Sequence, residues 1–594
     1  MDRLLSFCGN SLNEDRVMDS NQFEKERGIT IASKYTSLQY RGYTINAVDT
    51  PGHADFGGEV ERVLGMVDGA VLLVDATEGP LSQTKFVVEK ALKRGLHPLV
   101  VLNKVDRPSA TETRCDEVHS AAFDVFAHLG ATEEQLDFPV LFASAREGWA
   151  STKLPPAGEA PPGASMAPLL DALIDHVPAP AGNLADPFSF LVVMTEKDPF
   201  LGKIVTGRIH SGSVAVGDRI KLLRHRGGME EGFRVTKLFK RAGTRTIELD
   251  RAVAGDIVSI AGCAAAGIAD TVAAPAVLQP LPPGQIDPPT LSMVFSPNTS
   301  PLAGREGSQL TGTKIGERLA AEAETNVSLR VLPVEGSGGE SFEVQARGEL
   351  QLGLLIENMR REGFELSVSP PRVVLRQGEG GQKLEPLEEV VCEVEDPHAG
   401  EIIEMLTLRK GELQAMLPLE TEGKQRLVFE CPSRGLIGFR AAFAAITRGT
   451  GMLHRAFTRY GPYRGSMADA RKGTLVSTAA GRSTLHALGL LEPRGALFVD
   501  PGTDVYEGMI VGEHSRDSDL EVNPTREKAL TNVRAAGADE KVFLTPPRLI
   551  TLEDAIGYVG EDELIEVTPT KLRLRKRVLD SSSRKSLRRR AAAA

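Results

Sequence analysis

The sequence predicts a multidomain chain that is α/β at its amino end and α+β further on, and three observations lead to this expectation. The 594 residues are enough for about four domains. Short apolar strands alternate with helical patterns up to about residue 180, which is typical of a mostly parallel sheet. Two later segments repeat strands and helices in an order that indicates ferredoxin-like units.

The amino-terminal alternation consists of apolar strands at 44–49, 71–75 and 98–103, with a helix expected over 82–94. Each strand ends in a polar motif, and sheets of this kind bind ligands at that edge. The segment 151–168 is rich in Pro, Ala and Gly, so we expect a surface loop or an insertion there.

The middle of the chain has a different pattern. Between 186 and 283, short strands such as 202–209 and 216–220 alternate with glycines, which predicts a small β-barrel. The proline-rich segment 279–289 is expected to be a linker.

The two α+β units are predicted from apolar residues at helical spacing between apolar strands. The expected elements of the first unit are strand 342–346, helix 349–359 and strand 364–368. Those of the second are strand 390–394, helix 401–408, strand 426–430 and a helix near 436–446. A last block, from about 472 to 579, holds alternating strands and a polar loop.

The composition is that of a soluble globular protein, with 41% hydrophobic and 25% charged residues. No run of 18 apolar residues occurs, so nothing is expected to span or bind a membrane. The five cysteines are scattered without a C-x-x-C pair, which favours a reduced compartment and argues against a zinc site. Residues 1–7 lack the apolar core of a signal peptide.

The charge is uneven along the chain. The formal net charge is −11, which argues against a uniformly basic nucleic-acid binder, but the carboxyl end is strongly basic. Its cations are Lys571, Arg573, Arg575, Lys576, Arg577, Arg584, Lys585, Arg588, Arg589 and Arg590. A basic end on an acidic body suggests a local contact with a polyanion. For 584–590, a solvated tail is the equal alternative.

The most informative motif is Asn103-Lys104-Val105-Asp106, directly after an apolar strand. A carboxylate accepts two hydrogen bonds from N1 and N2 of guanine, and adenine has no matching donors, so Asp106 would select GTP over ATP. Asn103 would tie the loop to its neighbours, and the Lys104 stem would lie along the base. The alternative is an ordinary junction between a strand and a turn.

A second guanine contact is expected at Ser144 and Ala145, after the apolar residues 139–142. Their backbone N–H groups would meet the base. The dipeptide is a weak signal when taken alone.

The upstream motif Asp49-Thr50-Pro51-Gly52-His53 predicts the other half of a nucleotide site. Asp49 would hold Mg²⁺ through water, and the Gly52 N–H could approach the γ-phosphate because glycine has no side chain. His53 stands where Ras-like GTPases carry a glutamine that orients the attacking water. A solvated loop histidine is the alternative.

A threonine that precedes the Asp49 strand is the second candidate ligand of Mg²⁺. Thr30, within Glu26-Arg27-Gly28-Ile29-Thr30-Ile31, has a hydroxyl that could coordinate the ion when a switch loop closes over GTP. An ordinary strand threonine is the alternative.

The order R-G-I-T-I, D-T-P-G-H, N-K-V-D and S-A resembles the translational GTPases. Later motifs narrow the resemblance to the TypA/BipA family, over Asp2 to about Leu579. They are Arg434-Gly435-Leu436-Ile437-Gly438-Phe439-Arg440, Thr447-Arg448-Gly449, Val505-Tyr506-Glu507-Gly508-Met509-Ile510-Val511-Gly512-Glu513-His514 and Leu530-Thr531-Asn532-Val533-Arg534-Ala535. The last set is specific to that family.

The resemblance implies a domain order. The expected domains are a GTP-binding domain (1–182), a translation-factor β-barrel (183–285), two ferredoxin-like domains (286–376 and 385–465), a family-specific C-terminal domain (466–579) and a basic tail (580–594). The second ferredoxin-like domain is of the elongation factor G C-terminal type. Residues 372–387 leave no room for the further domain of elongation factor G, which excludes a translocase of that type.

The resemblance also implies a function. It predicts a monomeric, ribosome-associated factor with a role in translation, ribosome assembly or stress response. The factor would hydrolyse GTP with Mg²⁺ when the ribosome orders His53. Its C-terminal domain would meet ribosomal RNA and tRNA in the A site. The candidate phosphate contacts are Lys528, Arg534, Lys541 and Arg548, each with a solvated charge as the equal alternative. The compartment would be cytoplasmic or organellar (plastid or mitochondrial).

The sequence departs from the family at its start, because no G-x-x-x-x-G-K-[ST] loop occurs. Residues 2–9 match the first turns of the helix that follows this loop. Without the loop and the central strand before it, the phosphate cradle is lost and neighbouring strands expose unpaired edges. We expect the recorded start to be wrong. The rival hypothesis is a nucleotide-independent binder of the ribosome or RNA.

Overall fold

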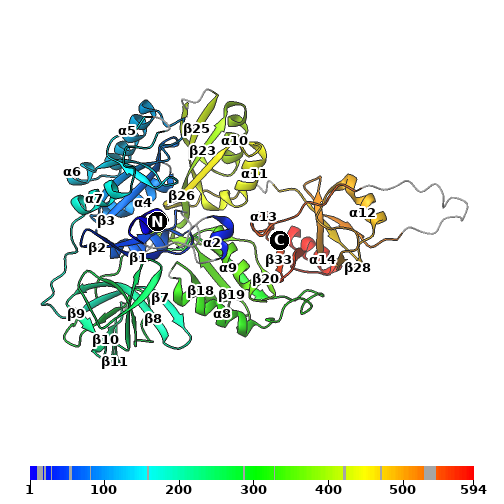
Figure 1. Cartoon of the computed structure of the whole chain (residues 1–594). Coiled ribbons are helices and arrows are strands. Elements are labelled where there is room, and N and C mark those ends of the chain that lie inside the picture. Colours follow the sequence, from blue (N-terminus) through cyan, green and yellow to red (C-terminus); the bar gives the residue numbers. More distant parts are fainter. Residues whose placement is uncertain are drawn as a thin grey trace, which may run out of the picture. The chain divides into compact units, whose positions relative to one another are not determined.

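A computed structural model describes residues 1–9, 18, 22–28, 30–52, 56–80, 82–156, 159–225, 227–284, 288–326, 328–418, 423–467, 471–527 and 544–593 (Figure 1). The chain divides into two compact units. The first consists of 1–288, 322–328 and 454–456, and the second contains the rest. In the described ranges no helix is both long enough and apolar enough to cross a membrane.

The α/β part of the first unit is built on a sheet with the order β3-β4-β5-β6. Its strands are β3 (Gly69–Asp75), β4 (His97–Asn103), β5 (Val140–Ser144) and β6 (Trp149–Ser151), and its covering helices are α4 (Ser82–Lys93), α5 (Glu112–His128) and α7 (Ala167–His176). The first three strands are parallel and β6 is antiparallel to β5. The predicted strands 71–75 and 98–103 and the predicted helix 82–94 are therefore confirmed.

The core of this sheet follows the two-residue period of β4. Val100 and Leu102 belong to one buried cluster with residues of α4 and α5. Leu99 and Val101 belong to a second cluster with residues of α7. Because successive side chains of a strand point to opposite faces, an unbroken apolar run is what a sheet covered on both faces requires.

The predicted strand 44–49 forms, but not where the sequence analysis placed it. It is β2 (Tyr43–Asp49), and it pairs antiparallel with β1 (Lys34–Tyr40). β1 in turn pairs with β12 (Lys237–Ala242), so this hairpin extends the sheet of the following domain. The expectation of one mostly parallel sheet through 44–49 was wrong. The backbone N–H and C=O groups of a strand need partners. Among the described residues no strand connects β2 with the sheet of β3, and β2 pairs with β1 instead.

This arrangement leaves β3 at an edge of its sheet, with a strand neighbour on one side only among the described residues. Two apolar side chains of β3 are also exposed, Val71 at 41% and Leu73 at 62%. An exposed apolar edge strand is a site of association with other chains.

The predicted barrel consists of antiparallel strands around a single apolar core. Its main strands are β7 (Ser189–Asp198), β8 (Gly202–Ser211), β10 (Arg219–Leu223), β11 (Met229–Arg234), β12, β13 (Arg245–Leu249), β15 (Ile257–Ala261) and β16 (Thr271–Ala273). Phe190, Val205 and Ile260 are fully buried in its centre. β9 (Ser213–Ala215) and β14 (Arg251–Val253) form a separate short pair.

The second unit opens with two α+β segments, as predicted. The first has β17 (Leu291–Pro297), α8 (Gly312–Thr325), β18 (Arg330–Pro333), β19 (Phe342–Ala346), α9 (Glu349–Arg361) and β20 (Leu366–Val368). The second has β23 (Lys383–Glu395), α10 (Asp396–Leu408), β24 (Glu412–Pro418), β25 (Lys424–Pro432), α11 (Phe439–Ile446) and β26 (Met452–Pro462). The helices and strands predicted for both segments are confirmed.

The carboxyl-terminal part is joined to both segments. Its elements are β27 (Thr474–Ser477), α12 (Leu485–Leu491), β31 (Met509–His514), β32 (Leu520–Val522), α13 (Leu552–Tyr558), β33 (Glu563–Val567), β34 (Leu572–Lys576) and α14 (Ser581–Ala593). β33 pairs with β20, which makes one continuous sheet. Gly438, at φ +68, begins α11 where a Cβ would lie 2.4 Å from the Gly557 carbonyl oxygen. Only glycine allows this close crossing of α11 and α13.

Three of the cations that suggested a polyanion contact are buried in this part of the fold. Arg573 pairs with Glu306 and Glu566, and Lys576 pairs with acidic groups that include Asp519. Arg575 is 2% exposed and donates to hydroxyl groups. For these three residues the expectation was wrong, because a buried charge must find its partner inside the protein.

Candidate guanine-nucleotide site

The motif Asn103-Lys104-Val105-Asp106 lies at the carboxyl end of β4, between β3 and β5. In the parallel register, Asn103 stands opposite Asp75 on one side and Ala143 on the other. The ends of three strands therefore meet at one edge of the sheet, where such folds bind ligands.

Asn103 connects the motif to the loop after β5. Its Oδ1 accepts a hydrogen bond from the Ala145 N–H at 3.0 Å. The Val105 N–H donates to the Ala143 carbonyl at 3.4 Å, and Val105 itself is buried. The Asn103 side chain thus connects the two segments that are predicted to contact guanine. The sequence analysis expected Asn103 to tie this loop to its neighbours.

The loop after β5 is itself held in shape by Ser144, which is fully buried. Its Oγ accepts a hydrogen bond from the Glu147 N–H at 3.3 Å, and its carbonyl accepts one from the Gly148 N–H at 2.8 Å. The side chain of Ser144 therefore supports the turn, and Ala145 is exposed at its edge.

Lys104 has the left-handed backbone conformation, with φ +67, which is rare for a residue with a side chain. Its Nζ lies 2.6 Å from Oδ2 of Asp75, at the end of β3. Asp75 Oδ1 accepts hydrogen bonds from the N–H and the hydroxyl of Thr77. Sequence reasoning missed Asp75, although its place at the end of an apolar strand was visible.

Asp75 is charged over most of the pH range. Burial opposes the charge, but the hydrogen bonds from Lys104 and Thr77 outweigh it and lower the pKa of Asp75 to about 2. Because this folded-state pKa lies below the ordinary value of 3.8, the charge stabilises the fold fully above about pH 4. That contribution is lost as the pH falls through about 2.

We therefore expect Asp75→Asn to destabilise the α/β part by about 1–2 kcal/mol at pH 7. The difference from the wild type should shrink below about pH 3. Trp149, the only tryptophan of the chain, lies in β6 of the same sheet, so its fluorescence during urea unfolding reports on this part alone. The exposed Asp137→Asn is the matched control, and an equal effect of both changes would contradict the role of Asp75.

Asp106, the predicted guanine selector, is half-buried. Within the described ranges it makes no hydrogen bond or ion pair through its carboxylate, unlike Asp75 nearby. The backbone around it is held by the Arg107 N–H, which donates to the Lys104 carbonyl at 3.1 Å. The carboxylate is therefore available to a ligand at the edge of the sheet.

Thr30 and Asp49 come from the β1–β2 hairpin. Lys34 and Asp49 are paired residues of this hairpin, and Thr30 lies four residues before Lys34, so both candidates are at the same end. The buried Glu24, which sequence reasoning also missed, accepts hydrogen bonds from the Ile31 N–H and from Lys34 Nζ. Glu24 thereby positions the segment that contains Thr30.

The remaining candidates of this motif are Gly52 and His53. Gly52 is exposed, and a Cβ added to it would meet no atom within 4 Å, so packing within the fold does not require glycine here. His53 lies outside the described residues. A hydroxyl and a carboxylate are ligands that Mg²⁺ prefers, so the side chains of Thr30 and Asp49 fit the predicted ion. The described parts hold no cluster of three His, Cys, Asp or Glu side chains suited to a metal, and Mg²⁺ bound with phosphates requires none.

Of the four predicted RNA contacts, Lys528, Arg534 and Lys541 lie outside the described residues. The Arg548 side chain is 47% exposed, and its Nη1 lies 3.5 Å from a carboxylate oxygen of Glu513. Its backbone N–H donates to the Leu497 carbonyl at 2.8 Å, which fixes this residue beside the sheet of the carboxyl-terminal part.

Four domain families match the chain in sequence order. They are the elongation factor Tu GTP binding domain (residues 1–179), elongation factor Tu domain 2 (202–273), the elongation factor G C-terminus (382–471) and the TypA/BipA C-terminal domain (472–581). A crystal structure of a protein from Thermus thermophilus has the same fold over 78% of this chain and 94% of its own, with a TM-score of 0.51 at 16% identity.

Fold, motif geometry and matched domains define the chain as a GTPase of the translation-factor class. Three relatives, each described as large ribosomal subunit assembly factor BipA, are similar over nearly their full length. The Synechocystis protein is 48% identical over 94% of this chain and 92% of its own. The Bacillus subtilis protein is 45% identical over 98% and 93%, and that of Escherichia coli K12 is 46% identical over 98% and 95%. This chain belongs to the TypA/BipA family.

Proposed function

We propose that this chain is a ribosome-associated factor that binds GTP with Mg²⁺ and hydrolyses it to GDP when the ribosome stimulates the reaction. Its relatives are described as assembly factors of the large ribosomal subunit, and we assign the same task to this chain. The carboxyl-terminal domain is the part that we expect to meet ribosomal RNA and A-site tRNA.

The observation that carries the proposal is the geometry of the guanine motif. The Asn103 bond to Ala145 and the Lys104 pair with Asp75 hold the loop, and neither uses the carboxylate of Asp106. Because the loop that carries this half-buried carboxylate is already fixed, little reorganisation is needed when guanine binds. Its two acceptor oxygens match the two N–H donors of that base.

The reaction assigns a role to each remaining candidate. Thr30 and Asp49 would hold Mg²⁺, which would supply positive charge beside the phosphates when bound. The Gly52 N–H would donate to a γ-phosphate oxygen. His53 would orient the water whose oxygen attacks the γ-phosphorus, while the bond to the bridging oxygen breaks and its electron pair leaves with GDP. Hydrolysis without the ribosome should be slow, because His53 must first be ordered.

A second candidate function is a nucleotide-independent binder of the ribosome or RNA. It is favoured by the separation of β2 from the sheet that carries Asn103. Loss of three or four charge-assisted hydrogen bonds to phosphate would weaken a site by about 5–10 kcal/mol.

Binding of the chain to purified ribosomes, with GTP or GDP present, separates the two functions. The GTPase hypothesis predicts an affinity that changes at least about tenfold between the nucleotides and ribosome-dependent release of phosphate. Equal, salt-sensitive binding in both nucleotides would support the second function instead. Peptide mass spectrometry of the endogenous protein, looking for residues upstream of Met1, decides whether the missing loop belongs to the natural chain.

A further inference from the structure

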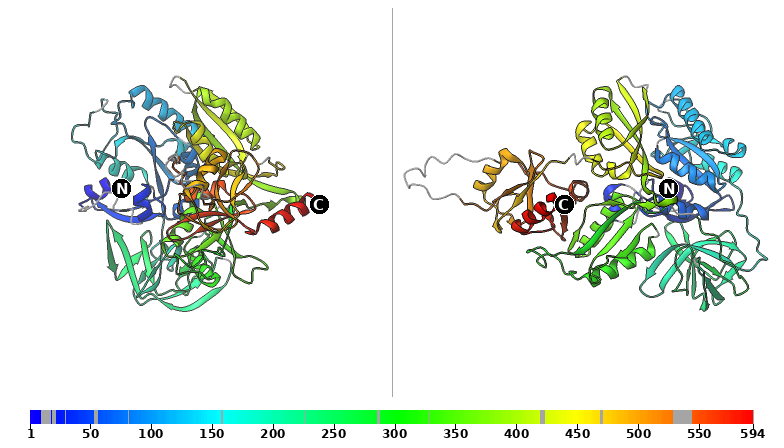
Figure 2. Two further views of the ribbon diagram at one scale, coloured as in Figure 1. Left: turned by 90° about the vertical axis from the view of Figure 1, so that its right-hand side faces the viewer. Right: turned by 180° about the vertical axis from the view of Figure 1, so that it is seen from behind.

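Helix α14 (Ser581–Ala593) forms the end of the chain, and no family assignment covers it. The TypA/BipA C-terminal domain match ends at residue 581, where the helix begins. Figure 2 shows α14 in red at the end marked C. The segment predicted as either a polyanion contact or a solvated tail is therefore a helix.

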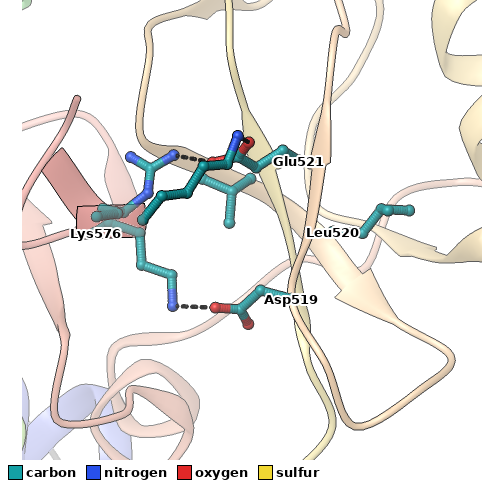
Figure 3. Close-up of a pocket in the computed structure, with 7 residues that line it drawn as sticks. Asp519, Leu520, Glu521 and Lys576 are labelled. Atoms are coloured by element: carbon teal, nitrogen blue, oxygen red, sulfur yellow. Dashed lines mark hydrogen bonds and ion pairs between the residues drawn. The ribbon is translucent and has the colours of Figure 1, made fainter. Parts of the chain in front are cut away.

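The first turns of α14 are fixed to the sheet by Glu521 of β32. This carboxylate, labelled in Figure 3, accepts hydrogen bonds. Its donors are the Ser581 hydroxyl at 2.6 Å and Arg584 at 3.1 Å, and it also pairs with Lys585 at 2.6 Å. The Ser581 N–H donates to Glu507 at 3.0 Å. The Arg584 side chain is 8% exposed, so the helix is held by a buried anchor rather than by a surface pair.

A cavity of about 290 Å³ lies beside this anchor, lined by Val476, Asp519, Leu520, Glu521, Lys576, Arg584 and Lys585. Its cations are matched by its own acids, since Lys576 pairs with Asp519 at 2.8 Å and Glu521 holds the helix. Such internal pairing leaves little charge for an anionic ligand in the cavity. The pairs of Glu521 with Arg584 and Lys585 hold α14 beside the cavity.

Two arginines further along α14 do not take part in this anchor. Arg589 and Arg590 are exposed and have no acidic partner within the described part of the chain. No acidic residue occurs between 581 and 593, so nothing within the helix offsets them. Leu587 is the only large apolar residue of α14, which leaves no apolar face of the kind that binds a membrane surface.

We propose that α14 is an arm that binds the phosphate backbone of RNA through Arg589 and Arg590. A guanidinium matches phosphate in a bidentate geometry, and a helix that is already anchored loses little entropy when its arginines bind. RNA is the polyanion we choose because the inference rests on the proposed association with ribosomes. The arm is separate from the predicted contacts at 528–548.

The test measures binding of the full chain to a labelled synthetic RNA hairpin by fluorescence anisotropy between about 50 and 200 mM salt. Arg589→Gln/Arg590→Gln should weaken binding at least about tenfold at the lowest salt. It should also reduce the slope of log K against log salt by about 1.8, since each duplex phosphate contact contributes about 0.9. Arg589→Lys/Arg590→Lys keeps the charge and should preserve the slope.

The matched control is Arg219→Gln/Arg245→Gln, which removes two exposed cations of the barrel and should leave the hairpin affinity within about twofold. Equal loss in both double variants, no loss in either, or no binding by the wild type would overturn the proposal. So would arginine-dependent binding to anionic lipid vesicles without arginine-dependent binding to RNA. The hairpin assay needs neither nucleotide nor ribosome. Its result can therefore be interpreted even if the proposed function is wrong.

Discussion

Replacing Asp106 with asparagine should reverse the base preference of the nucleotide site from guanine to xanthine. The carboxylate accepts hydrogen bonds from N1–H and from the 2-amino group of guanine. An asparagine can accept from N1–H but donates at the second position, where xanthine has a carbonyl. Two mismatched groups in a half-buried site cost about 3 kcal/mol or more, or at least about a hundredfold in affinity.

The measurement is the ratio of GDP to XDP affinity, by competition against a fluorescent nucleotide. Both ligands have the same phosphates, so the ratio does not depend on how well the chain holds phosphate. Asp137→Asn, an exposed substitution in the same domain, should leave the ratio unchanged. If Asp106→Asn leaves the GDP-to-XDP ratio as it was, the guanine assignment of this motif is wrong.

The second large effect is expected at His53. His53→Ala should lower ribosome-stimulated GTP hydrolysis by about 10²–10⁴-fold, the range for loss of a positioned group that acts on the attacking water. The unstimulated rate and the affinity for ribosomes should change little, since the imidazole acts only after the ribosome has ordered it. Phosphate release under single-turnover conditions, with and without ribosomes, separates the two rates.

His128→Ala, an exposed histidine of α5, is the control for this series. Equal stimulated rates in His53→Ala and the wild type would refute the catalytic assignment. A loss of ribosome binding that matches the loss of rate would place His53 in the interface instead.

Local features could be predicted because each depends on a short stretch of residues. The apolar run before Asn103 predicts a covered strand, and the polar residues after it must then lie at the strand's end. Asn103 was assigned its tie to the neighbouring loop from its place in the motif, and its bond to Ala145 has that geometry. The helices 349–361 and 396–408 follow in the same way from apolar residues at helical spacing.

Features that depend on distant residues could not be predicted in this way. The strand 43–49 could pair with 69–75 or with another strand, and the choice depends on which strand edges the fold leaves unpaired. In this fold the hairpin β1–β2 joins the barrel at β12. The ion pair of Lys104 with Asp75 needs two strand ends that are 29 residues apart in the sequence to be adjacent. Strand period and motif carry no information about such partners.

The sequence by itself determined the family and the strand and helix pattern, and it supplied the residues proposed to contact a guanine base. Only the tertiary structure decided which charges are available. Arg573, Arg575 and Lys576 are as basic in the sequence as Arg589 and Arg590, yet the first three are buried among carboxylates and hydroxyl groups. The reason is physical: a charge leaves water only where the fold supplies a partner, and that partner comes from a distant part of the chain.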